Sequence, residues 1–129
     1  MKRQGGDMRL IVAVLLMTLT APAWAEWVKY GETDWVVVYY DPTTIGRNGE
    51  LRQVWTILDL KKRRRRGGLS RRYLSSYDCQ QNRKRILSRI TYSDHMAGGK
   101  VVRKRETPGE WFNIRPHTFS ATMHQIVCQ

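Results

Sequence analysis

The sequence has few of the residues on which catalytic and metal sites are usually built. Its 129 residues include only two cysteines and three histidines. The histidines are His95, His117 and His124, and their spacing is not that of the three or four ligands that a metal site requires. No phosphate-binding glycine loop, nucleophile elbow or paired-carboxylate pattern is present either. We therefore predict a protein that is not an enzyme and that uses no metal or cofactor.

Long hydrophobic stretches are also lacking. The apolar run from Leu10 to Leu19 is shorter than the roughly 20 residues that a membrane-spanning helix requires. Basic residues precede this run, and Ala23-Trp24-Ala25 follows it as a small-x-small cleavage site, so residues 1–25 are predicted to be a secretory signal peptide. No cysteine follows the run as a lipidation site. We expect a mature domain, residues 26–129, in the periplasm or secreted, with no lipid anchor and no transmembrane span.

The two cysteines are predicted to form a disulfide because the exported chain would fold in an oxidising compartment. Cys79 lies in the middle of the sequence and Cys128 is the next-to-last residue. The bond would fasten the end of the chain to the centre of the fold. The chain-entropy model gives about 4 kcal/mol of stabilisation for a closed loop of this length.

Acidic residues are scarce as well. The chain has 11 Asp and Glu against 23 Lys and Arg, a net charge of +12, which favours acidic polysaccharides, phosphates and acidic proteins as partners. Export makes nucleic acid a poor candidate. Six cations are contiguous before Gly67-Gly68, and they form either a solvated loop or an anion-binding site. The predicted binding residues are Lys61, Lys62, Arg63, Arg64, Arg65, Arg66, Arg71 and Arg72.

Alternating and β-branched patterns predict strands over residues 27–30, 35–40, 51–60, 73–80, 83–93 and 100–105. Asn48-Gly49 predicts a hairpin turn. From Thr118, a candidate N-cap, apolar residues recur at helical spacing. The predicted fold class is α+β: an antiparallel sheet of about six strands with a C-terminal α-helix packed on one face and tethered by the disulfide.

The strand over 83–93 has an irregular pattern. Period-2 alternation places Ile86, Ile90 and Tyr92 on one face, and Leu87 is the exception. The same alternation places the polar side chains on the other face, namely Arg83, Arg85, Arg89 and Thr91.

One face of the sheet is left without a clear partner. Strands 35–40 and 51–60 have apolar side chains on both faces, and one short helix can cover only one of them. The other face would be an interaction surface or homodimer contact. Alternatively, loops 41–47 and 106–116 would fold over it.

Several short segments, in this order and spacing, resemble the surface-adhesin protein E family over nearly the whole mature chain. They are Glu26-Trp27-Val28, 38–45, Val54-Trp55 with Asp59, Tyr77-Asp78-Cys79, Arg85-Ile86-Leu87, Tyr92, 98–102, Trp111 and 116–128. The resemblance implies a sheet with a disulfide-tethered C-terminal helix. It also implies an exported adhesin-like protein whose partners are host matrix or plasma proteins, such as vitronectin, laminin and plasminogen.

Two functions follow from these observations. The first is an exported, non-enzymatic, adhesin-like protein that binds acidic host or envelope polymers or proteins through the basic loop. The alternative is a structural periplasmic envelope protein that dimerises or docks on a partner through its sheet face, with the basic loop incidental.

Overall fold

The structure is a computed structural model that describes residues 25–65 and 67–129. The predicted signal peptide, apart from Ala25, and Arg66 of the basic loop lie outside the described residues. Two one-turn 3-10 helices are present, η1 (Pro42–Thr44) and η2 (His95–Ala97). The strands and the C-terminal helix are β1 (Val28–Glu32), β2 (Val36–Tyr40), β3 (Gly46–Asn48), β4 (Leu51–Leu60), β5 (Ser70–Asp78), β6 (Arg83–Tyr92), β7 (Val101–Arg105), β8 (Phe112–Asn113) and α2 (Phe119–Val127).

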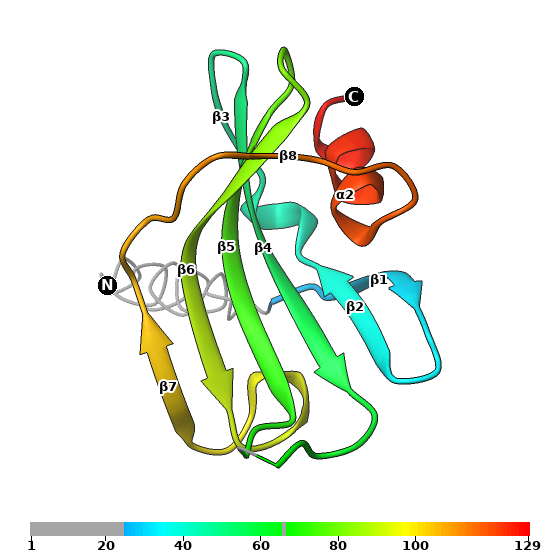
Figure 1. Ribbon diagram of the computed structural model, residues 1–129, viewed down its shortest axis with the longest axis vertical. Helices are drawn as coiled ribbons and strands as arrows, with labels where there is room; N and C mark the ends of the chain where they lie inside the picture. The colour runs from blue at the N-terminus through cyan, green and yellow to red at the C-terminus, as the bar shows by residue number, and fades with distance from the viewer. Residues whose placement is uncertain (1–24, 66) are drawn as a thin grey trace, which may run out of the picture.

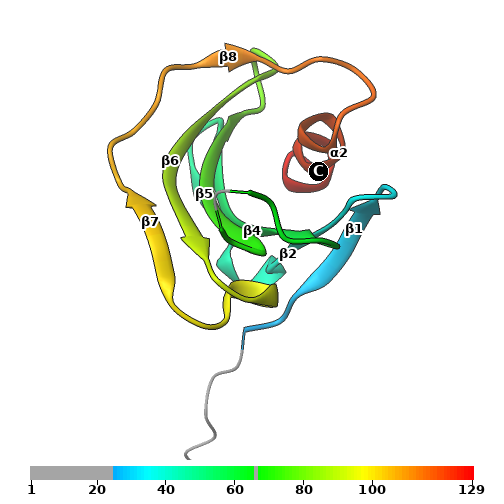
Figure 2. The same cartoon turned by 60° about the horizontal axis from the view of Figure 1, so that its bottom comes forward.

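The strands form one antiparallel sheet in the order β1-β2-β4-β5-β6-β7 (Figure 1). Strand β3 pairs with β4 beyond the end of β2, and β8 pairs with the start of β6 beyond the end of β7. The sheet is strongly curved, and α2 lies inside the curve (Figure 2). We call the side that faces α2 the concave face and the opposite side the convex face. The predicted fold class is confirmed, with two short strands added.

Local sequence signals explain where these elements begin and end. The Asn48-Gly49 hairpin joins β3 to β4, and Gly49 has a φ of +61°, a conformation that glycine adopts without a Cβ clash. The Thr118 hydroxyl accepts a hydrogen bond from the backbone N–H of Ala121 at 3.1 Å, which satisfies one of the free donors at the start of α2. The predicted turn and N-cap are both confirmed.

The predicted faces of β6 are wrong beyond Leu87. Leu74 pairs with Ser88 and Ser75 pairs with Ile86, so Leu87 is the extra residue of a β-bulge. A bulge shifts the side-chain alternation by one position. Ile86 therefore points to the concave face, whereas Ile90 points to the convex face. Strict alternation misplaced these residues because it assumed an unbroken strand.

The main core lies between α2 and the neighbouring end of the concave face. Val54, Tyr77, Met123 and Val127 are all at most 2% exposed and pack in one cluster. The predicted disulfide is confirmed between Cys79, directly after β5, and Cys128, directly after α2. The covalent bond holds the end of the helix against the cluster.

Loops and stacked cations lie on the convex face, and segment 106–116 contributes, which agrees with the second of the two alternatives for this face. The Arg83 and Arg85 guanidinium groups lie 4.6 and 5.1 Å from the centre of the Trp111 ring. At the other end, η2 is anchored because the backbone N–H of Met96 donates to the Asp59 carboxylate at 2.9 Å. The sequence indicated a connection over residues 93–99 but did not predict that it covers this face.

Candidate functional site

The basic loop joins β4 to β5, and all its described cations, residues 61–65, are exposed. The Lys61 ammonium lies 2.6 Å from the Glu32 carboxylate, and the Arg63 guanidinium donates to the Ser93 carbonyl at 2.9 Å. Glu32 is also paired with Lys29. The hydrogen-bonded ammonium groups of Lys29 and Lys61 lower the pKa of Glu32 to about 2. Two of the loop cations are therefore already engaged with the protein.

The remaining loop cations are freer. Arg64 lies over the exposed Trp35 ring, 5.3 Å from its centre. Lys62 and Arg65 form no ion pair with any residue that the structure describes. Exposed contacts of this kind are weak, so the loop retains cations that a ligand could engage.

The two other predicted binding residues lie on opposite faces of the sheet because they are consecutive in β5. Arg72 points to the convex face, where its guanidinium lies 4.5 Å from the centre of the Trp55 ring and 6.0 Å from that of Tyr92. Arg71 points to the concave face, because it pairs with Thr91 and Leu58 on that side. The structure therefore does not bring these two arginines together.

The concave face carries a second cluster of cations away from α2. Arg71 pairs with Thr91, which pairs with Arg103, and Arg89 pairs directly with Arg105. Alternation places all four arginines on the same side of β5, β6 and β7. We call Arg71, Arg89, Arg103 and Arg105 the concave arginine face.

These arginines surround a hollow of about 490 Å³, to which Thr91 and Lys104 also contribute. Arg89 and Arg105 also line a neighbouring hollow of about 300 Å³ with Ile86 and Phe112. None of the four guanidinium groups forms an ion pair with another residue of the described part of the chain. Positive charge is therefore concentrated at the larger hollow, whereas the Glu110 side chain also lines the neighbouring one.

The same face changes character where α2 covers it. The Lys84 ammonium is mostly buried, donates to the Ser120 hydroxyl at 2.8 Å and lies 5.3 Å from the centre of the Tyr77 ring. Burial lowers the pKa of Lys84 to about 8, because desolvation penalises the charged form. Burial also raises the pKa of Tyr77. This end of the face belongs to the packed interior.

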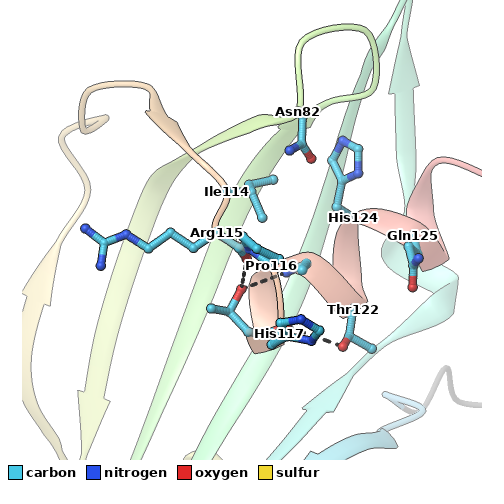
Figure 3. Close-up of a pocket in the computed structure, with 10 residues that line it drawn as sticks. Asn82, Ile114, Arg115, Pro116, His117, Thr122, His124 and Gln125 are labelled. Carbon is cyan, nitrogen blue, oxygen red and sulfur yellow. Dashed lines mark hydrogen bonds between the residues drawn. The ribbon is translucent and has the colours of Figure 1, made fainter.

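A further pocket of about 660 Å³ lies where α2 meets the β5–β6 turn and segment 114–118 (Figure 3). His117 and His124 both line it, and His124 is held by a 2.9 Å contact between its Nε2 and the Asp78 carbonyl. His95 instead lies 3.2 Å from Asp59. Within the described residues no group of three His, Cys, Asp or Glu could hold a metal ion.

Sequence reasoning missed Arg89, Arg103 and Arg105 as a site. It favoured the basic loop because those cations are contiguous, whereas these three arginines lie on two strands. The sequence did contain one signal for this site: Arg103 and Arg105 are two residues apart in a predicted strand, so their side chains lie on the same face. Their meeting with Arg89 depends on the register between β6 and β7.

A curved antiparallel sheet, a short helix inside the curve and a disulfide that joins the two define a small, basic α+β domain. The chain belongs to the surface-adhesin protein E family, whose model matches residues 27–129. No helix in the described part of the chain is long and apolar enough to cross a membrane.

Several solved structures have the same fold. Haemophilus influenzae protein E is 15% identical, covers 85% of this chain and 90% of its own, and superposes with a TM-score of 0.63. The structure of crystal form II of Haemophilus influenzae protein E is 16% identical in sequence. The match covers 78% of this chain and 95% of that chain, with a TM-score of 0.59. Protein E from non-typeable Haemophilus influenzae is 17% identical over 85% and 81%, with a TM-score of 0.60. No curated protein matches the chain in sequence.

Proposed function

We propose that this chain is an exported, non-enzymatic, adhesin-like domain that binds acidic host or envelope polymers and proteins through its basic loop. Membership of a surface-adhesin family supports the general role. The observation that carries the proposal is the exposure of every described loop cation in residues 61–65. Arg66 adds another charge, and Arg71 lies at the start of the strand that follows.

Binding through such a loop is expected to be multivalent and salt-dependent. Each exposed contact is weak, and ionic screening acts over about 8 Å at physiological salt. Gly67 and Gly68 both have positive φ angles, 77° and 94°, which suit a glycine-containing connection. Because its contacts are exposed and individually weak, we expect the loop to bind polyanions by their charge and not one small ligand by its shape.

Heparin-affinity chromatography tests the proposal. The variant Lys62→Ser/Arg64→Ser/Arg65→Ser removes three exposed loop charges, and Arg47→Ser/Lys100→Ser/Arg115→Ser removes three exposed charges elsewhere. The loop variant should elute at clearly lower salt than the control, and both should melt like the unmodified protein. Equal elution of the two variants would refute the role of the loop and leave the alternative, an envelope protein that docks through its sheet.

The export step is part of the proposal, because a signal peptide is expected in residues 1–25. N-terminal sequencing of protein from the periplasm or medium should begin at Glu26. Retention of residues 1–25 on protein associated with the inner membrane would instead show that the apolar segment acts as an anchor.

A further inference from the structure

The concave arginine face is a second candidate site, which adjoins the basic loop at Gly68. We propose that it binds a sulfated polysaccharide chain. Its four arginines come from three adjacent strands, β5, β6 and β7. Because paired strands hold the four arginines, this site would be more rigid than the basic loop, whose cations lie in a connection between strands.

The arrangement of charge is unfavourable for the folded protein by itself. Arg89 and Arg105 are directly cross-strand partners, and like charges in that position are destabilising. Arg71 and Arg103 lie two strands apart on either side of Thr91, which corresponds to roughly 10 Å at the usual spacing between strands. A ligand with several negative groups at comparable intervals would relieve this repulsion.

Arginine indicates which anionic group would bind. Its planar guanidinium donates two parallel hydrogen bonds to an oxyanion such as sulfate or carboxylate, whereas lysine acts as a point charge. The concave arginine face is defined by four guanidinium groups, and it can therefore bind several oxyanions in this two-hydrogen-bond manner. Arg89, Arg103 and Arg105 are exposed, so a ligand reaches them without any rearrangement of the core.

Apolar side chains beside the arginines favour a saccharide over a bare anion. Phe112 is 46% exposed and lines the hollow that shares Arg89 and Arg105. Tyr73 pairs with Arg89 on the same face and lines the hollow next to α2. The C–H faces of a sugar ring pack well on such rings, and its charged substituents would then meet the guanidinium groups.

The geometry also allows one chain to reach both basic surfaces. A Cβ atom on Gly68 would lie 2.7 Å from the Thr91 side chain, so Gly68 lies against the residue that separates Arg71 from Arg103 in the sheet. The loop cations precede Gly68 in the chain, so a polysaccharide that continues past Gly68 would approach the loop. The two sites could therefore act together, although either can exist without the other.

Calorimetric titration with a heparin oligosaccharide of defined length, at physiological salt, tests the proposal. The face variant is Arg89→Gln/Arg103→Gln/Arg105→Gln, and the control with equal charge is Arg47→Gln/Lys100→Gln/Arg115→Gln. All six residues are exposed, and so both variants should fold. The face variant should lose roughly tenfold or more in affinity and the control roughly twofold or less. Equal losses would overturn the proposal, because they would show an effect of net charge only.

The loop variant Lys62→Gln/Arg64→Gln/Arg65→Gln separates this inference from the proposed function. If only the loop variant loses affinity, the concave site is refuted and the loop proposal stands. If only the face variant does, the concave site is supported and the loop proposal fails. Losses in both variants beyond the control would support two sites.

Two further measurements test the class of ligand. Phe112→Ser keeps the charge and should weaken oligosaccharide binding several-fold, whereas unchanged affinity would remove the argument for a sugar ring. Polyglutamate should bind more weakly than heparin of equal charge. The affinity for polyglutamate should also fall less than the affinity for heparin when the face variant replaces the unmodified protein. Equal affinity and an equal response would overturn the polysaccharide in favour of an acidic protein segment.

Discussion

The two ends of the concave face use the same strands for opposite purposes. At the end under α2, β5 and β6 contribute Tyr77 and Lys84 to a packed interior. At the other end, the same strands contribute Arg71 and Arg89 to an open hollow. Strand alternation decides only which face a side chain occupies. The position of the helix decides whether that face becomes core or stays open to solvent.

The difference has an energetic consequence. Packing at the covered end contributes to the free energy of unfolding, because buried apolar side chains leave water. Like-charged arginines at the uncovered end contribute little or oppose folding. Substitutions at the two ends should therefore separate stability from binding.

Loss of the disulfide should have the largest effect. Cys128→Ser opens a bond that joins residues 49 apart in sequence, and the free energy of unfolding should fall by about 4 kcal/mol. Urea denaturation followed by tryptophan fluorescence measures this. Reduction should destabilise the unmodified protein by a similar amount and leave the variant unchanged. A variant as stable as the oxidised protein would show that packing alone holds α2.

Removal of a core side chain from α2 should come next. Met123 is fully buried, and Met123→Ala should cost about 3 kcal/mol because it leaves a cavity. Gln125→Ala, on the exposed side of the same helix, is the matched control and should change stability by less than about 0.5 kcal/mol. Similar losses in both variants would contradict the packing of α2 on the concave face.

Lys84 should give a pH-dependent effect at the covered end. Its pKa is lowered to about 8 in the folded state, whereas the unfolded chain keeps a value near 10.5, so the unfolded state binds more protons between these values. Stability relative to Lys84→Met should therefore increase by about 1–2 kcal/mol from pH 7 to pH 9.5. Urea denaturation at several pH values measures the difference. Parallel pH profiles would mean that the ammonium is well solvated.

The smallest effect on stability is expected at the uncovered end. Arg89→Gln/Arg103→Gln/Arg105→Gln should change the free energy of unfolding by less than about 0.5 kcal/mol, or increase it slightly as repulsion is removed. Thermal denaturation monitored by circular dichroism measures the change. A loss comparable to that of Met123→Ala would show that these arginines are structural, and the contrast between the two ends would disappear.

Much of the fold could be predicted because its signals are local. Asn48-Gly49 prescribes a hairpin, Thr118 is an N-cap whose hydroxyl accepts from the helix, and β2 and β4 carry dense apolar patterns. The disulfide was also predictable, since only two cysteines are present and the N-terminus indicates export. The basic loop was visible as a contiguous run, and its role stays a proposal.

The sequence by itself determined the kinds of elements, their order and the covalent link between Cys79 and Cys128. Only the tertiary structure decided where the faces lie, because the bulge at Leu87 reverses the alternation that local periodicity assumes. It alone decided that Lys84 is buried under α2 and that Arg71, Arg89, Arg103 and Arg105 meet in one place. This clustering of arginines depends on strand register and sheet curvature. Both arise from pairing between residues that are distant in the chain, so they cannot be predicted from any single segment of the sequence.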